Sequence, residues 1–320
     1  MRGRRMLWLV AVAAALVLAV VVAVVVTRPK PPEVAGPGPA PGPTPGPSAT
    51  GDVLIVKIDD IAPARPATGL GSADVVYVEP MEGGLTRLAA VFSTRRPSVA
   101  GPVRSARETD YDLLAQYGKP VFAYSGAVPQ IVQALHSPPL TDTVVNASPA
   151  DTRGAYYRDA SRSAPHNLFA RADALPTTSA RTPASLFPPG GAPGGGVPVT
   201  ERTVAYGAAT FSFRWQAGHW LIWQDGSPFT STEAGQLAAG TVIVQRVATH
   251  PEPFPEDTGG GVTPVAETVG SGTATVLRDG MSFAATWSRP AAGSATTFTT
   301  GDGQALPVAA GPVWVLLVAS

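Results

Sequence analysis

The chain has 320 residues, of which 23 are basic, 23 acidic and 44% hydrophobic, and it contains no cysteine. This length and apolar content suffice for one large or two modest domains, and the lack of cysteine excludes disulfides, thiolate metal sites, a cysteine nucleophile and a lipidated cysteine. Residues 1–51 hold five basic residues and one acidic residue, so 18 basic and 22 acidic residues remain in 52–320. This mildly acidic body lacks the basic footprint of a nucleic-acid-binding protein, so we exclude nucleic acid as a partner.

Residues 1–28 are expected to form an N-terminal transmembrane anchor. Positions 6–26 are 21 consecutive apolar residues, enough at about 1.5 Å per residue to cross a bilayer core. A cleaved signal peptide is the less favoured alternative, because the run is long and ends without a small-residue cleavage site. Three arginines precede the run, which predicts a single-pass protein of the cell membrane with an extracytoplasmic body.

The next segment, 29–51, reads "PKPPEVAGPGPAPGPTPGPSATG". A composition so rich in proline and glycine is typical of a linker, either semi-extended or disordered. We therefore expect the globular body to begin at residue 52.

Residues 52–178 are expected to form an α/β domain, because strand-like and helix-like patterns alternate. "GPVRSARETD" at 101–110 contains the capping-box pattern Ser105-x-x-Glu108 before an apolar-periodic run, which predicts a helix over about 106–117. A second helix is expected at 128–137. The expected strands lie at 52–60, 74–81, 86–94, 120–126 and 141–148.

Residues 179–198 are a Gly/Pro-rich loop or linker, and residues 199–320 are expected to form a second, mainly antiparallel β part. Asp225-Gly226 and Asp279-Gly280 each separate two strand-like runs, which is a strong hairpin signal. The tryptophans of this part are expected in the core, and stacking on sugar rings is the alternative.

Several stretches together resemble the YerB-like family, also known as the DUF3048 domain with its N- and C-terminal parts. The motifs are "EGGLTR" at 82–87, "GPVRSAR" at 101–107 and "APHN" at 164–167, with further similar segments at 241–247 and 270–290. The resemblance implies a membrane-attached extracytoplasmic bacterial protein without an established activity. It also implies a layered α/β sandwich with a mixed sheet, followed by the β-rich part. Many relatives look like lipoproteins, and this chain departs from them because it has no cysteine.

Arg104 and Arg107 lie where the predicted helix begins, although that end of a helix is already positive. One explanation is an anion site, in which both guanidinium groups and the amides after Ser105 bind a carboxylate or phosphate. The other explanation is internal pairing with acidic residues at the ends of nearby strands. We expect Arg104 to be structural and Arg107 to face a ligand. The acidic candidates are Asp59, Asp60, Glu79 and Glu82.

Two more motifs carry candidate site residues. In "EGGLTR", Glu82 and Arg87 flank flexible glycines, so the motif is either a tight turn or a ligand contact. In "APHN", His166 is a candidate general acid or base with Asn167 as its orienter, and a loop-fixing role for His166 is the alternative.

These patterns favour a non-enzymatic envelope protein that binds an anionic or glycan ligand, such as cell-wall material, or an envelope partner. The alternative is an envelope hydrolase or transferase that uses Glu82 and His166 as its catalytic residues. The four histidines show no metal-ligand spacing, and no phosphate loop or dinucleotide fingerprint is present, so we expect neither a metal nor a cofactor.

Overall fold

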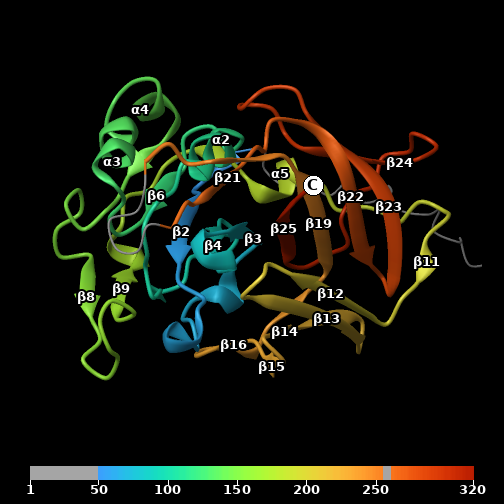
Figure 1. The fold of residues 1–320 in the computed structure, drawn as a ribbon, viewed down its shortest axis with the longest axis horizontal. Helices are drawn as coiled ribbons and strands as arrows, with labels where there is room; N and C mark the ends of the chain where they lie inside the picture. Colours follow the sequence, from blue (N-terminus) through green and yellow to red (C-terminus); the bar gives the residue numbers. More distant parts are fainter. Residues whose placement is uncertain (1–49, 255–260) are drawn as a thin grey trace, which may run out of the picture. The chain divides into compact units, whose positions relative to one another are not determined.

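The computed structural model describes residues 50–254 and 261–320, and one large mixed sheet contains strands from both ends of this range. Strand β25 (Val313–Ala319), near the C-terminus, pairs in parallel with β19 (Thr241–Val247) on one side and with β3 (Val75–Pro80) on the other. Figure 1 shows these C-terminal strands beside the N-terminal strands β3 and β4. The backbone hydrogen bonds of β25 therefore join the N-terminal and C-terminal halves of the body.

The strands of this sheet differ in how they are buried. Strands β2, β3, β4 and β25 are buried along nearly their whole length, as expected for strands covered on both faces. Strand β23, farther toward one edge, alternates buried and exposed residues. The spatial order is β11 (Val197–Pro198), β23 (Met281–Arg289), β22 (Gly270–Arg278), β19, β25, β3, β4 (Thr86–Phe92), β2 (Leu54–Ile58), β6 (Val121–Ala123) and β7 (Val145–Asn146), with β24 (Thr297–Thr300) on β23.

A second sheet packs on one face of the large sheet. Phe211 and Trp220 from this second sheet share a hydrophobic core with Trp314 and Leu316 of β25, and the rings of Phe211 and Trp314 lie 6.3 Å apart. Tryptophans 220, 287 and 314 are buried, as expected, whereas Trp215 and Trp223 are half-buried. The second sheet consists of β12 (Glu201–Ala205), β13 (Thr210–Gln216), β14 (His219–Gln224), β15 (Ser227–Pro228) and β18 (Ala238–Ala239).

Helices and loops cover the other face, where Leu113 and Tyr117 pack with Ile55 and Tyr77 in a second core. The helices are α2 (Thr109–Ala115), α3 (Pro129–Leu135), α4 (Leu140–Thr143) and α5 (Pro183–Leu186), with single 3₁₀ turns at η1 (Ala62–Ala64), η2 (Leu70–Ser72), η3 (Glu82–Gly84) and η4 (Ala172–Ala174). The remaining strands form a three-stranded sheet, β5 (Val99–Ala100), β9 (Leu168–Arg171) and β8 (Tyr156–Arg158), and the pairs β1 (Thr50–Gly51) with β10 (Ala180–Arg181), β16 (Thr230–Ser231) with β17 (Gly235–Gln236), and β20 (Thr249–Pro251) with β21 (Pro264–Ala266).

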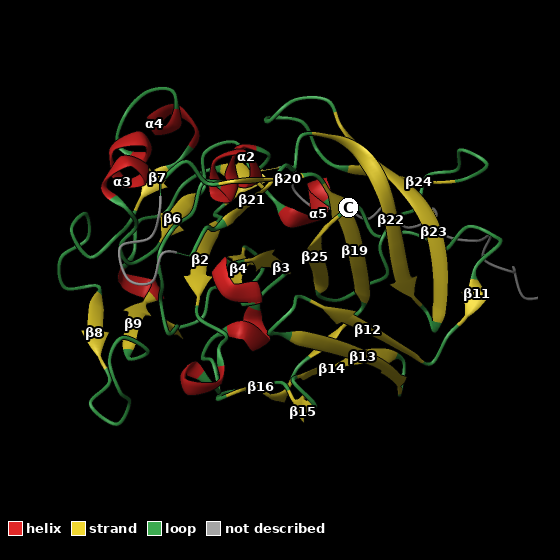
Figure 2. Ribbon diagram, viewed as in Figure 1, coloured by secondary structure: helices red, strands yellow, loops and turns green. Residues whose placement is uncertain are grey.

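The expected layered α/β sandwich is wrong, because the structure is mostly β-sheet (Figure 2). Among the described residues the longest helices, α2 and α3, have 7 residues each, while β22 and β23 have 9 each. The physical reason is that strands, rather than long helices, cover much of the central sheet. The predicted strand at 141–148 is also partly wrong, since it begins with α4 and only then enters β7.

The expected transmembrane helix has no support in the described part of the chain. Within residues 50–254 and 261–320, no helix is both long enough and apolar enough to cross a bilayer. The apolar run at 6–26 and most of the predicted linker at 29–51 lie outside the described residues.

We predict that the fragment 52–198 does not fold without the C-terminal half. Alone it would expose the edge of β3 that β25 covers, together with the apolar face that Phe211 and Trp314 bury. Amide NMR spectra of this fragment should therefore show poor dispersion, whereas the fragment 47–320 should give a dispersed spectrum. A well-dispersed spectrum from 52–198 alone would show that the two halves are independent.

Candidate anion-binding site

Charged side chains gather at one end of the central sheet. Strands β2 and β3 end there, and the antiparallel strand β4 begins there, with Glu79 directly opposite Arg87 in the pairing of β3 with β4. Because side chains alternate along a strand, Lys57, Asp59, Glu79 and Arg87 share the sheet face on which α2 lies. The loops that follow β3 and β5 meet the sheet at the same end.

Lys57 is the most deeply buried cation of this group. Its Nζ contacts the carboxylate of Glu79 and lies 2.9 Å from Oδ1 of Asp110, the second residue of α2, and none of the three side chains is more than 1% exposed. Burial, with a smaller effect from the charge of Asp110, raises the pKa of Glu79 above its usual range. The other oxygen of Asp110 accepts a 2.7 Å hydrogen bond from the backbone N–H of Arg107. This buried network therefore also fixes the segment that carries the arginines.

Arg104 and His166 meet at one carboxylate oxygen of Asp59. The Nε of Arg104 lies 3.0 Å from Asp59 Oδ2, and Nδ1 of His166 lies 2.7 Å from the same atom. Since a carboxylate accepts hydrogen bonds, Nδ1 of His166 is the donor here. Arg104 keeps 25% of its side chain exposed, so this part of the cluster reaches the surface.

Arg107 pairs with Glu82 in the turn after β3. Its Nη2 lies 3.3 Å from Glu82 Oε1, and its Nη1 donates to the backbone carbonyl of Ala106. The other oxygen of Glu82 accepts a 3.0 Å hydrogen bond from Thr263. Burial opposes ionisation of Glu82, but the charges of Arg107 and Arg87 and the hydrogen bonds to the carboxylate together outweigh it and lower the pKa of Glu82. Arg107 is only 3% exposed and Arg104 is 25% exposed, so this burial gives no support to the expectation that Arg107 faces a ligand.

Arg87 differs from its two neighbours because it lacks a direct carboxylate partner. Its side chain is buried, and Nη1 makes a long 3.4 Å hydrogen bond to the backbone carbonyl of Ser105. Within the described part of the chain no carboxylate lies at ion-pair distance from Arg87, and its Nε has no hydrogen-bond partner. Burial first, and then the charges of Arg107 and Arg104, lower the pKa of Arg87 to about 10. Three guanidinium groups thus lie near one another, and among the described residues Arg87 has no directly paired carboxylate.

The predicted capping box of Ser105 and Glu108 is wrong. Helix α2 begins at Thr109, and no side chain caps it through a hydrogen bond. The backbone of the preceding segment is already engaged, since Arg104 N donates to the carbonyl of Lys57 and Ala106 N to that of Gly126. These long-range hydrogen bonds engage the backbone of Arg104 and Ala106, so the first helix-like bond is the one from Asp110 N to the carbonyl of Arg107. Arg104 therefore lies outside the helix, and Arg107 lies two residues before Thr109, where α2 begins.

The hydrogen bonds of Asn167 are made outside the arginine cluster. Its Oδ1 accepts a 2.7 Å hydrogen bond from Arg158, and its backbone carbonyl accepts one from Asp159. These bonds close the loop between β8 and β9. His166 is thus oriented by Asp59 and not by Asn167. Of the predicted site residues, the structure brings together Glu82, Arg87, Arg104, Ser105, Arg107 and His166.

The sequence analysis missed Lys57, Asp110 and the pair Thr86 and Gln224. A lysine inside the apolar run "VLIVKI" was the available signal, because a lysine in a buried strand needs carboxylate partners.

On the opposite sheet face, Asp60 Oδ2 accepts hydrogen bonds from Thr86 at 2.6 Å and from Gln224 at 3.0 Å. Gln224 belongs to β14, so this contact ties the second sheet to the end of β2. Burial raises the pKa of Asp60 to about 6.

Two family profiles match the chain. Both carry the description "protein of unknown function (DUF3048)": the N-terminal domain matches residues 42–185 and the C-terminal domain matches residues 200–315. The two profiles meet at the site, because Thr263 in the second match binds Glu82 in the first.

One curated relative and one solved structure are similar to the chain. The relative is YerB of Bacillus subtilis (strain 168), named as a candidate lipoprotein, which is 37% identical over 82 residues; these are 26% of this chain and only 24% of that protein. The crystal structure of YerB protein from Bacillus subtilis superposes with a TM-score of 0.67 at 19% identity, covering 85% of this chain and 92% of the other. This similarity shows that the two proteins share a fold.

We predict that Lys57→Met destabilises the protein by about 3–5 kcal/mol, because it leaves the carboxylates of Glu79 and Asp110 buried without their cation. The matched control is Lys119→Met at an exposed lysine, which should change the free energy of unfolding by at most about 0.5 kcal/mol. Urea unfolding at pH 7.5 measures both. Equal stabilities of the two variants would contradict the structural role of the Lys57 network.

We also predict a pH dependence that Asp60 causes. In the folded state the pKa of Asp60 is about 6, above its ordinary value of 3.8. Between pH 3.8 and pH 6 the folded state therefore keeps a proton that the unfolded state has released. Asp60 therefore makes its full contribution to the free energy of unfolding below about pH 4. This contribution, about 3 kcal/mol, is lost as the pH rises through 6. Unfolding of wild type and Asp60→Asn from pH 4 to 7 checks this. The difference in the free energy of unfolding between the two proteins should change with pH over this range. A difference that does not change with pH would refute the prediction.

Proposed function

Because the chain belongs to the DUF3048 family, whose domains are described as being of unknown function, we propose a function from its own site: the protein binds a small anionic ligand at Arg87, with Arg104 and Arg107 beside it. The ligand would carry a carboxylate or a phosphate group, since both match the planar donor fork of arginine.

The observation that supports this proposal is the missing partner of Arg87. A buried charge without a counter-ion is costly, and burial in proteins normally comes with ion pairs and full hydrogen bonding. Arg104 has Asp59 and Arg107 has Glu82, but Arg87 has one long bond to a neutral carbonyl. An anion at Arg87 would supply the missing acceptor and offset the repulsion from the two other arginines.

The surroundings favour an anion over a cation or a neutral molecule. After burial, the charges of Arg107 and Arg104 lower the pKa of Arg87, and the charges of Asp59 and Glu82 raise it by smaller amounts. The exposed quarter of Arg104 gives the side from which a ligand would approach. Cell-wall material and other envelope anions carry such groups, and they remain our candidates for the natural ligand.

The alternative enzyme, with Glu82 and His166 as catalytic residues, has less support. Both carboxylate oxygens of Glu82 are already engaged, one by Arg107 and one by Thr263. Its lowered pKa keeps Glu82 ionised at neutral pH, which makes it a poor general acid. Nδ1 of His166 donates a hydrogen bond to Oδ2 of Asp59, the same oxygen that Arg104 contacts. This contact holds the His166 ring in one orientation, as expected for a residue that binds a ligand.

We place this binding function at the bacterial cell envelope. The relative YerB is named as a candidate lipoprotein, and we carry envelope association over to this chain. The chain contains no cysteine that could be lipidated, so the apolar run at 6–26 would serve for membrane attachment. The body would then lie outside the membrane, where an anionic envelope ligand could reach Arg104.

We predict that inorganic phosphate stabilises the wild-type chain and not the Arg87→Met variant. At tenfold excess over its dissociation constant, a ligand of the folded state adds about 1.4 kcal/mol, which should raise the melting temperature by a few degrees. Thermal unfolding in phosphate is compared with unfolding in chloride at equal ionic strength. Without phosphate, Arg87→Met should be as stable as wild type or more stable, because it removes a buried charge that has no direct partner.

The matched control for this experiment is Arg202→Met, which removes the same charge from an exposed position on β12. It should keep the full response to phosphate. The proposal fails if phosphate stabilises Arg87→Met and wild type equally. It also fails if Arg87→Met loses several kcal/mol without any anion, since Arg87 would then belong to a self-sufficient ion-pair network.

A further inference from the structure

The structure contains a cavity of about 550 Å³ at the other end of β3 from the arginines. Its floor is formed where β3 and β25 begin, at Val75 and Val313. This volume lies in the range of sites for small molecules, which are mostly apolar with a few polar groups that orient the ligand. The cavity shares no residue with the arginine cluster.

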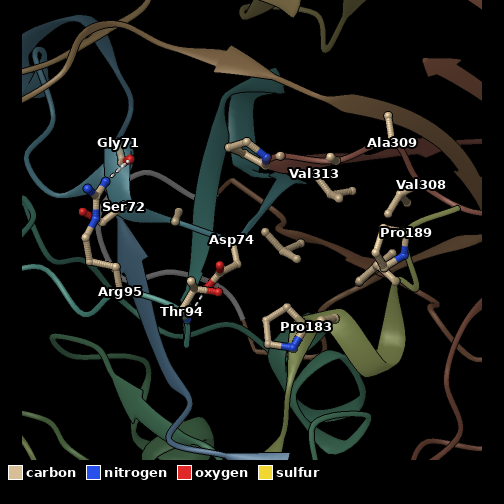
Figure 3. A pocket seen from close by; sticks show the side chains of 17 residues that line it. Gly71, Ser72, Asp74, Thr94, Arg95, Pro183, Pro189, Val308, Ala309 and Val313 are labelled. Atoms are coloured by element: carbon tan, nitrogen blue, oxygen red, sulfur yellow. Dashed lines mark hydrogen bonds between the residues drawn. The ribbon is translucent and has the colours of Figure 1, made fainter. Parts of the chain in front are cut away.

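Most of the cavity wall is apolar. In Figure 3 Pro189, Val308 and Ala309 lie on the side away from Arg95, with Pro183 of α5 below and Val313 above. Proline, valine and alanine offer neither donors nor acceptors from their side chains, so this part of the wall suits a hydrocarbon or an aromatic ring.

The polar edge is centred on Asp74, the only acidic residue among the described residues that line the cavity. Its Oδ2 accepts hydrogen bonds from the backbone N–H groups of Ser93 at 2.7 Å and Thr94 at 2.9 Å. Its Oδ1 accepts none from any described residue, and no described cation lies at ion-pair distance from it. In Figure 3 the carboxylate lies beside Thr94 at the middle of the cavity. One acceptor therefore remains available to a ligand.

Arg95 also lines the cavity but is held at its rim. Its Nη2 donates to the backbone carbonyl of Gly71 at 2.9 Å (Figure 3), and the side chain is exposed. The guanidinium group is thus directed away from Asp74, which it does not neutralise. The cavity combines an apolar wall with one unpaired carboxylate oxygen.

We propose that this cavity binds a small apolar amine, with its ammonium group on Asp74 Oδ1 and its hydrocarbon part against Pro183, Phe187 and Val308. The carboxylate selects for a positive hydrogen-bond donor and against an anion. The apolar wall selects for a ring or a short branched chain. This site is independent of the anion site proposed above, and its ligand has the opposite charge.

The test uses three probes with the same ring: benzylamine, benzyl alcohol and benzoate. Isothermal titration of the full chain, with the detergent blank subtracted, should show benzylamine binding at least tenfold more tightly than benzyl alcohol, and no binding of benzoate at this site. Equal affinities for the three probes would overturn the proposal, as would a complete lack of benzylamine binding at millimolar concentration.

Substitutions at residues that line the cavity then test whether benzylamine binds there. Ala184→Phe in α5 and Ala310→Phe on the opposite wall would each fill the cavity, so each should weaken benzylamine at least tenfold. Ala291→Phe adds the same ring at an exposed position outside the cavity and should leave the affinity unchanged.

Asp74→Asn keeps an acceptor for the N–H groups of Ser93 and Thr94 but loses the negative charge. It should lower the affinity for benzylamine to that for benzyl alcohol. Unaltered benzylamine binding in a folded filling variant and in Asp74→Asn would show that the amine binds elsewhere.

Discussion

The buried contacts of Lys57 determine how the charged end of this protein is arranged. A lysine in the middle of a fully buried strand requires carboxylates, and β3 and α2 supply them through Glu79 and Asp110. Asp110 also binds the backbone of Arg107, so the same network positions the segment that carries Arg104 and Arg107. The segment with Arg104 and Arg107 therefore depends on one buried lysine, for which we propose no ligand contact.

The site also depends on the joining of the two halves of the chain. Strand β25 lies between β19 and β3, and the β20–β21 pair reaches the site, where Ala266 binds Thr109 and Thr263 binds Glu82. On the opposite face, Gln224 binds Asp60 at the end of β2. Residues from both matched domains thus hold the polar end of one sheet. Two segments far apart in sequence thus meet at the proposed site.

Local sequence predicted the buried strands well, because β2, β3 and β4 are mainly apolar apart from Lys57, Glu79 and Arg87, and Asp279-Gly280 turns the β22–β23 hairpin. It also offered Asp59 and Glu82 as partners for the arginines. It failed at Ser105, where a capping pattern loses to long-range hydrogen bonds of Arg104 and Ala106. The contact of His166 with Asp59 spans 107 residues, so no local pattern could reveal it. The α/β prediction failed because helices rather than strands were expected to cover the sheet.

The central claim is that the guanidinium group of Arg87 is completed by an anion, and a crystal soaked in tungstate tests it most directly. Tungstate resembles phosphate in shape and charge, and its anomalous scattering locates it without ambiguity. The account predicts a tungstate oxygen within hydrogen-bond distance of Arg87, on the side where Arg104 is exposed. Tungstate bound only at other surface arginines, with Arg87 unchanged, would contradict it.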